Sequence, residues 1–322
     1  EEEKVEVEEE EKVEVEEEEK VEVEEENKHK LDKIYIINLE EKAERWKKIS
    51  SRIEEENCSK PVQPFIGING SKLNTNQIRN DVSKLSGRFF MTNEMYGKAK
   101  SHYGLWKSII NENENKKTDK DWFLILEDDA IIPNELNKYI SELETFLNSM
   151  PEDIIHKTDM FNLSPIGDYG GKNDFHNKIM SLLTSIGSMI MGGKRKSNNK
   201  ELYNLSREGG NQWSLLNSNF PLCTHSYLVN IKQLKNLVKV IDRTKIYYHL
   251  DWQLNLENVN INSILPIGIK RGGYDDSTSS TLTNPSIPIQ ILTMFNKKLA
   301  CDLGKPVVNN MGMYQLNILI IV

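Results

Sequence analysis

Three consecutive carboxylates, Glu127, Asp128 and Asp129, are the side chains of this sequence best suited to chemistry. They follow an unbroken apolar run at 122–126 (WFLIL), which is typical of a strand covered on both faces. Adjacent carboxylates repel one another and resist burial. A divalent cation that holds a diphosphate would explain them, because ligands bind at the carboxyl edge of open α/β sheets. The alternative is that Asp128 and Asp129 cap a helix that begins near Pro133.

The elements before the acidic strand supply further polar groups. A strand is expected at 34–39 and a helix at 40–56, with Asn38 and Arg45 near the turn between them. No Gly-x-Gly-x-x-Gly pattern occurs at this turn, which disfavours a dinucleotide-binding site. A second helix is expected at 94–111, and it contains Ser101 and His102. A lone histidine on such a helix is more often a packing or solvent residue than a ligand.

The elements after it continue the alternation of helices and strands. We expect helices at 134–148 and 231–244, and strands at 159–163, 222–229 and 264–269. Residues 166–219 are poorly patterned, and their Gly-Gly-Lys-Arg stretch does not meet the order of a phosphate loop. We interpret this segment as an insertion or an acceptor-side flap.

Composition narrows the class of protein. The 322 residues are 38% apolar and 28% charged, which is typical of a folded, soluble chain. Residues 1–26 are repeats of EEEEKVEV with a charge of −14, and subtracting this from the total of −8 leaves +6 on the rest. Such a body suits an anionic ligand but carries no nucleic-acid motif. Three cysteines without paired spacing favour neither disulfides nor zinc, and no secretory signal or membrane-spanning run is present.

The sequence therefore predicts three regions. Residues 1–30 form an acidic tail that cannot build a core and that could bind a basic partner. Residues 31–305 form the catalytic domain, and 306–322 form a C-terminal tail. A cytoplasmic location, in a bacterium or in a virus-infected host cell or virion, fits the absence of a signal and the abundance of asparagine and lysine.

Four separated blocks resemble glycosyltransferase family 25, which includes bacterial lipooligosaccharide galactosyltransferases, animal procollagen galactosyltransferases and enzymes of large DNA viruses. Their order and approximate spacing agree over residues 33–280, although the second block lacks the family's cysteine. The blocks are IYIINLEEKAERW at 34–46, YGKAKSHYGLW at 96–106, LILEDDA at 124–130, and CTHSYLVN at 223–230 with HLDWQL at 249–254.

The resemblance implies an α/β fold of the GT-A type, a nucleotide-sugar-binding fold with a mostly parallel central sheet flanked by helices. It implies a metal-dependent, inverting transfer of galactose or glucose from UDP-galactose or UDP-glucose, with Mn²⁺ or Mg²⁺ as cofactor. The acceptor would be a glycan or the hydroxylysine of a collagen-like protein. The alternative is a catalytically silent domain of the same fold that binds a partner through its acidic tail.

Residue roles follow from the same resemblance and from the chemistry of a departing diphosphate. Asp129 is expected to ligate the metal directly, Asp128 to make a second contact or to bind the ribose, and Glu127 to orient them or share the metal. Asn38, Leu39 and Arg45 are expected near the nucleotide. Ser101 and His102 are expected in the donor pocket.

Inverting transfer also needs a base for the acceptor hydroxyl. Asp251 is the best candidate, because its apolar neighbours predict partial burial; the alternative is a structural carboxylate paired with Arg243, Lys245 or Arg271. His249 is expected to contact the metal or a phosphate, or else to lie on the surface. Asp276 and Ser277 fall where the family's last block lies.

Overall fold

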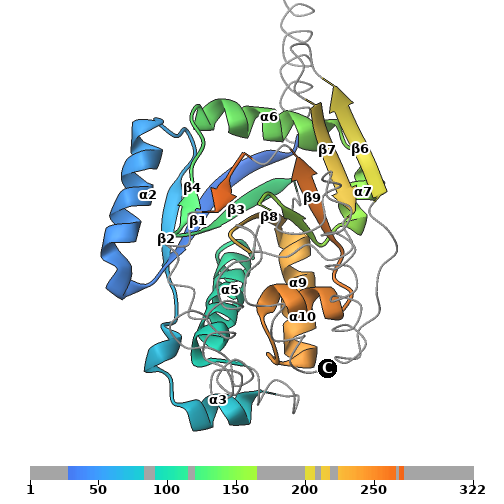
Figure 1. Cartoon of the computed structure of the whole chain (residues 1–322). Helices are drawn as coiled ribbons and strands as arrows, with labels where there is room; N and C mark the ends of the chain where they lie inside the picture. Colours follow the sequence, from blue (N-terminus) through green and yellow to red (C-terminus); the bar gives the residue numbers. More distant parts are fainter. Residues whose placement is uncertain are drawn as a thin grey trace, which may run out of the picture.

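The computed structural model describes residues 28–82, 91–114, 120–164, 200–206, 212–217, 224–265 and 268–271. It contains an eight-stranded sheet with helices on both faces, which confirms the predicted α/β class (Figure 1). The predictions for the acidic and C-terminal tails, for 166–199, and for Asp276 and Ser277 lie outside the described residues. Within the part of the chain that is described, no helix is both long and apolar enough to cross a membrane.

The strand order of the sheet is β2-β1-β3-β8-β5-β9-β7-β6. Among the described strands, β8 and β7 run against the other six, so the sheet is mixed but mostly of one direction. A separate two-stranded sheet pairs β4 (Ala130–Ile131) with β10 (Lys270–Arg271). The strands of the large sheet are β1 (Lys30–Asn38), β2 (Val62–Ile66), β3 (Asp121–Glu127), β5 (Met160–Asn162), β6 (Lys200–Ser206), β7 (Gln212–Asn217), β8 (Ser226–Asn230) and β9 (Ile261–Leu265).

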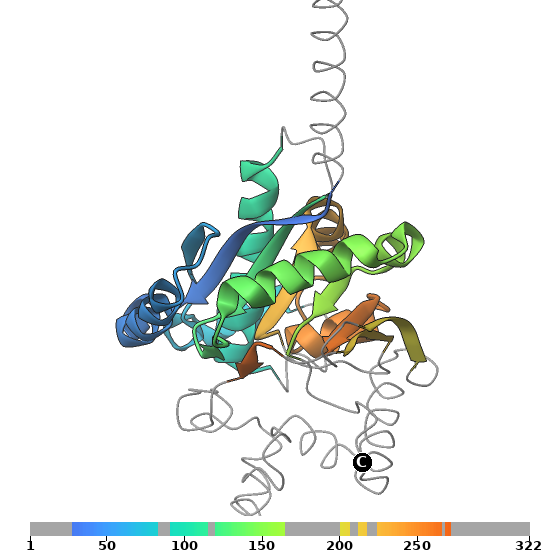
Figure 2. The same ribbon diagram turned by 90° about the horizontal axis from the view of Figure 1, so that it is seen from above.

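Helices cover the two faces as separate layers, α6 on one side and α5, α9 and α10 on the other (Figures 1 and 2). The core is correspondingly divided into two clusters of apolar side chains. The first layer contains α2 (Ala43–Glu55), α6 (Leu136–Ser149) and α7 (Glu152–Lys157). The second contains α5 (Asn93–Glu112), α9 (Ile231–Thr244) and α10 (Leu250–Leu256). Two 3₁₀ turns, η1 (Glu40–Lys42) and η2 (Gly70–Lys72), and the helix α3 (Thr75–Asp81) complete the described elements.

The side chains of β3 alternate between these two layers, as a strand requires. Phe123 and Ile125 pack in the cluster that contains α5 and α9, whereas Leu124 and Leu126 pack in the cluster that contains α6. By the same alternation, Glu127 emerges on the α5 face of the sheet. The alternation of side chains along β3 therefore directs Glu127 towards α5 rather than towards α6.

Two helices that position the site begin with side-chain caps. The Thr92 hydroxyl accepts a hydrogen bond from the Met95 N–H at the start of α5. At the start of α9, Asn230 Oδ1 accepts from the Gln233 N–H and Gln233 Oε1 accepts from the Asn230 N–H. Such caps satisfy backbone donors that a helix leaves without partners, and they fix where these helices leave the sheet.

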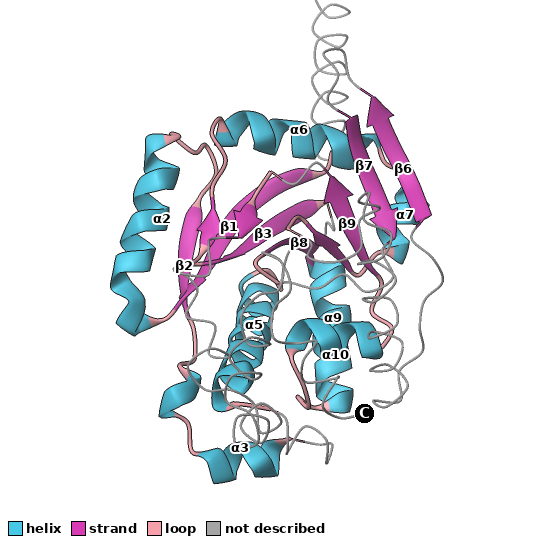
Figure 3. Cartoon of the chain, in the orientation of Figure 1, coloured by secondary structure: helices cyan, strands magenta, loops and turns pink. Residues whose placement is uncertain are grey.

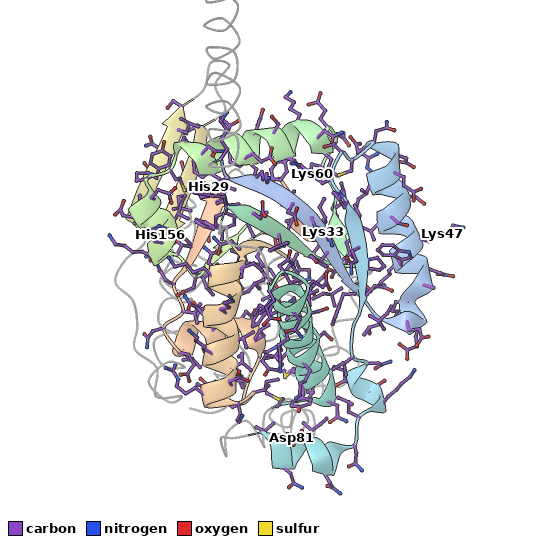
Figure 4. The ribbon with its side chains drawn as sticks, turned by 180° about the vertical axis from the view of Figure 1, so that it is seen from behind. His29, Lys33, Lys47, Lys60, Asp81 and His156 are labelled. Atoms are coloured by element: carbon purple, nitrogen blue, oxygen red, sulfur yellow. The ribbon has the colours of Figure 1, made fainter. Side chains whose placement is uncertain are left out.

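The opposite end of β3 is fixed by His29, which precedes β1 (Figure 4). His29 Nδ1 accepts a hydrogen bond of 3.0 Å from Trp122 Nε1, and the His29 backbone exchanges two hydrogen bonds with the Asn148 side chain. In the same view Lys47 points into solvent from α2. His29 thus lies at the amino end of β3, opposite the end that bears the carboxylates.

The described part of the segment 166–219, which we interpret from the sequence as an insertion or an acceptor-side flap, forms one edge of the sheet as β7 and β6 (Figure 3). The described part of this segment is an antiparallel strand pair, and β7 pairs with β9 of the main sheet. Trp213 and Leu215 lie buried in the core. These strands are part of the sheet, and the interpretation of the segment as an insertion or an acceptor-side flap stays a prediction.

Candidate active site at the carboxyl end of β3

Glu127 is held by three donors that converge on one of its oxygens. Its Oε1 lies 2.8 Å from Lys98 Nζ, 3.0 Å from Thr224 Oγ1 and 3.3 Å from His102 Nε2. Lys98 and His102 come from successive turns of α5, and Thr224 precedes the antiparallel neighbour β8. Because these contacts use Oε1, Glu127 Oε2 remains directed at the other polar groups of the site.

His225 bridges Glu127 and Asp129. Its Nε2 lies 3.0 Å from Asp129 Oδ2 and 3.7 Å from Glu127 Oε2. β8 runs antiparallel to β3, so its first residues meet the end of β3, and the Glu127 N–H donates to the His225 carbonyl. One ligand atom from each of these three residues lies within 4.8 Å of the others.

The donor set of Glu127, Asp129 and His225 fits a divalent metal ion. The Asp129 side chain is 7% exposed, and its Oδ1 has no hydrogen-bond partner among the described residues. A buried carboxylate oxygen without a partner is costly unless a ligand completes it. Carboxylate oxygens with one imidazole nitrogen suit Mn²⁺, and the oxygens alone suit Mg²⁺.

The charges of the site keep these two carboxylates ionised. Burial opposes ionisation of Glu127, but the charges of His225 and Lys98 and the hydrogen bond from His102 outweigh it and lower its pKa well below the usual value. Burial likewise opposes ionisation of Asp129, and His225 outweighs it and lowers the pKa. At neutral pH both carboxylates are therefore ionised, the form that binds a metal ion.

Asp128 belongs to a different set of contacts. Its Oδ2 accepts a hydrogen bond of 2.8 Å from Asn38 Nδ2, and its Oδ1 lies 3.2 Å from an Arg45 guanidinium nitrogen. Burial raises the pKa of Asp128, and the charge of Asp129 adds to the rise, while Arg45 opposes it. Asn38, Arg45 and Asp128, which were all predicted for the nucleotide site, are thus in contact. Asp128 is not in the group of candidate metal ligands.

The structure excludes the helix-capping alternative for Asp128 and Asp129. The N-cap residue of α6 is Glu135, which makes no cap with its own side chain. The backbone N–H groups of Glu135 and Leu136 donate instead to Glu56 Oε2. The carboxylates after β3 are not needed to start this helix.

Ser101 and Leu39 make local structural contacts. The Ser101 hydroxyl donates to the Gly97 carbonyl at 2.8 Å and accepts from the Ile68 N–H at 2.7 Å. A Cβ on Gly97 would lie 2.7 Å from the Ile68 carbonyl oxygen, so only glycine permits this approach of the chain to α5. Leu39 is half-buried, and its carbonyl accepts from the Lys42 N–H in η1. Neither residue is placed against the carboxylates by these contacts.

His102 lies in a buried chain of hydrogen bonds that leads to Glu127. Trp106 Nε1 donates to the Tyr227 hydroxyl, and this hydroxyl lies 2.8 Å from His102 Nδ1. Burial lowers the pKa of His102, so the ring is neutral at pH 7. The consistent assignment has Tyr227 donating to Nδ1 and the Nε2–H donating to Glu127. His102 therefore orients Glu127 and does not join the candidate metal ligands.

Removing one hydroxyl tests this chain. We expect Tyr227→Phe to lower the free energy of unfolding by about 1–3 kcal/mol, because Trp106 Nε1 and His102 Nδ1 would lose their partner inside the core. Urea unfolding measures the change, with Tyr203→Phe on β6 as the matched control. A Tyr227→Phe protein as stable as the wild type would contradict the assignment.

His249 and Asp251 lie at the start of α10, which packs against α5. Both are buried, and Asp251 Oδ1 accepts from the Trp252 N–H at 2.9 Å. Burial lowers the pKa of His249 to about 4, and the charge of Lys98 contributes to the shift. The first turn of α10 thus lies within electrostatic range of Lys98. His249 is buried rather than on the surface, and it is not among the grouped ligands.

Among the predicted partners of Asp251, Arg243 has a guanidinium nitrogen 3.6 Å from Glu257 Oε2. The side chain of Arg271, another of these partners, is outside the described part of the structure. Arg243 therefore pairs with Glu257, which removes one of the partners that the structural alternative for Asp251 proposed.

Sequence reasoning missed Lys98, Thr224 and His225. Lys98 stands four residues before His102, so helical spacing alone places both on one face of α5. Thr224 and His225 are in the block at 223–230, but only the pairing of β8 with β3 brings them to the carboxylates.

Comparison with known proteins identifies the family of the chain. The model of glycosyltransferase family 25 (LPS biosynthesis protein) matches residues 31–252, more than half of the chain. The matched range runs from β1 into α10 and contains all the site residues described above. No curated protein matches the chain.

Proposed function

Since the chain belongs to glycosyltransferase family 25, we propose that it moves galactose or glucose from a UDP-sugar to a hydroxyl group with inversion at the sugar. The acceptor is a glycan or the hydroxylysine of a collagen-like protein. The observation that carries the proposal is the group of possible metal ligands Glu127, Asp129 and His225 at the carboxyl end of the buried strand β3.

In this proposal Glu127 Oε2, both oxygens of Asp129 and His225 Nε2 provide the ligand atoms for Mn²⁺ or Mg²⁺. The bound ion would offset the negative charge of the donor's diphosphate. Thr224 and His102 hold Glu127 in place through its other oxygen, at 3.0 Å and 3.3 Å. The protein thus fixes the orientation of a ligand before the metal arrives.

On the other side of β3, Asp128 binds the nucleoside. Asn38 and Arg45 hold its carboxylate oxygens at 2.8 Å and 3.2 Å, and this fixes the side chain at the end of β1. A carboxylate so placed accepts hydrogen bonds from ribose hydroxyls. Glu127 and Asp129 thus serve the diphosphate on one side of the chain, and Asp128, which lies between them in the sequence, serves the nucleoside on the other.

Asp251 acts as the base. As the acceptor oxygen bonds to the anomeric carbon of the sugar, its proton passes to the Asp251 carboxylate. The bond from that carbon to the diphosphate breaks at the same time, and UDP leaves with the bonding electrons. Burial at the start of α10 positions Asp251 next to Trp252, away from competing solvent protons.

Donor turnover without an acceptor tests the proposal, because it needs no knowledge of the acceptor. We expect UDP release from UDP-galactose or UDP-glucose in the presence of Mn²⁺ and none in the presence of EDTA. The donor that reacts identifies the sugar. If neither donor is hydrolysed and neither binds, the alternative of a silent domain that acts through its acidic tail replaces this proposal.

A further inference from the structure

Lys98 places a positive charge in the candidate metal site. Its Nζ lies 2.8 Å from Glu127 Oε1, although its side chain remains 35% exposed. Its charge lowers the pKa of Asp129 and of His249 as well as that of Glu127. The ammonium group is therefore part of the charge cluster at the carboxyl end of β3.

A divalent cation at Glu127, Asp129 and His225 would conflict with this arrangement. Two cations that share one carboxylate repel each other, most strongly where burial reduces screening. Glu127 Oε1 does not depend on Lys98, because Thr224 and His102 also donate to it. A lysine has a flexible four-carbon stem, and a partly exposed ammonium can turn to another anion at little cost.

We propose that Lys98 exchanges partners during donor binding, from Glu127 in the metal-free protein to the donor's diphosphate once a divalent cation occupies the site. This inference rests on the proposed function. The ammonium leaves a carboxylate that the metal takes over and gains a phosphate that the metal brings close to it. Metal and diphosphate then bind with positive coupling, part of which passes through Lys98.

The location of Lys98 supports a diphosphate as its second partner. Lys98 Nζ lies 2.8 Å from a carboxylate of the candidate metal site, so a diphosphate bound to a metal ion there would lie near the ammonium. Lysine is a common point-charge partner of phosphate oxygens. In this position it would add positive charge where negative charge develops on the departing UDP.

Calorimetric titrations test the exchange without measuring turnover. Mn²⁺ is titrated into the full chain alone, and UDP is then titrated in saturating Mn²⁺, for the wild type, Lys98→Met and Lys107→Met. Lys107 is the matched control, because it is an exposed lysine of the same helix at the ring of Tyr103, nine residues from Lys98. Thermal unfolding checks that each variant is folded.

We expect Lys98→Met to bind Mn²⁺ alone on the order of tenfold more tightly, because a repelling charge is gone. We expect the same variant to bind UDP in Mn²⁺ on the order of tenfold more weakly, because the diphosphate loses a cation. Lys107→Met should match the wild type in both titrations. A purely structural lysine would not produce changes of opposite sign.

Two results would overturn the exchange. If Lys98→Met leaves both affinities unchanged or weakens both, Lys98 is a structural partner of Glu127, and the proposed function stands on the wild-type binding. If the wild type binds neither Mn²⁺ nor UDP, the proposed function fails, and the exchange fails with it.

Discussion

Asp129→Asn should abolish measurable Mn²⁺ binding and reduce UDP release from the donor on the order of 10²–10³-fold. The substitution keeps the size of the side chain but removes its charge and one of its two carboxylate oxygens. The buried Oδ1, which has no partner among the described residues, is the atom that the metal is expected to complete. Calorimetry with Mn²⁺ and an assay of UDP release measure the two effects.

Asp153→Asn is the matched control, because Asp153 is an exposed carboxylate on α7 that pairs with Lys157 at 2.9 Å. It should leave both measurements unchanged. An Asp129→Asn protein that binds Mn²⁺ with wild-type affinity would show that the metal, if any, binds elsewhere.

Asp251→Asn should reduce turnover by about 10²–10⁴-fold, the usual effect of losing a general base, while UDP and Mn²⁺ bind as in the wild type. Asparagine keeps the Oδ1 acceptor for the Trp252 N–H, so the start of α10 should be preserved. Steady-state transfer to an acceptor gives kcat, and calorimetry gives the binding affinities.

The structural alternative for Asp251 predicts a different pattern. If the carboxylate only supports α10, Asp251→Asn lowers thermal stability and weakens UDP binding together with turnover. Asn255→Ala is a useful comparison, because Asn255 Nδ2 donates to the Asp251 carbonyl and so supports the same helix without a carboxylate. A loss of kcat alone in Asp251→Asn, and not in Asn255→Ala, assigns the base.

Much of the sheet could be predicted because its central strands β1, β3 and β8 are mostly buried on both faces. The run at 122–126 is β3, and the expected helix at 231–244 coincides with α9. The expected strand at 264–269 was misplaced, since β9 ends at Leu265. Its residues 261–263 include the polar Asn262 and Ser263, which are fully buried, so hydropathy alone gives no strand there.

The hairpin of β6 and β7 could not be predicted for a similar reason. Only three residues of β7 pair with β9, and both strands mix polar and apolar residues without a strict period of two. The interaction that fixes them is packing of Trp213 against Tyr139 and Phe146 of α6. Such a contact joins segments more than sixty residues apart and leaves no local pattern.

The three consecutive carboxylates were predictable as a site, but the different contacts that each of them makes were not. Sequence order does not show that Asp128 turns towards Asn38 and Arg45 while Glu127 and Asp129 meet His225. His225 enters the site because β8 runs antiparallel beside β3. Local sequence does not specify which strand is the neighbour or in which direction it runs, so its contribution required the structure.

Anomalous diffraction from a crystal grown with Mn²⁺ and UDP would locate the metal itself. We expect one Mn²⁺ peak bounded by Glu127, Asp129 and His225, with the diphosphate of UDP on the ion and Asp128 towards the ribose. A manganese peak away from these three side chains, or UDP bound elsewhere in the molecule, would contradict this proposal.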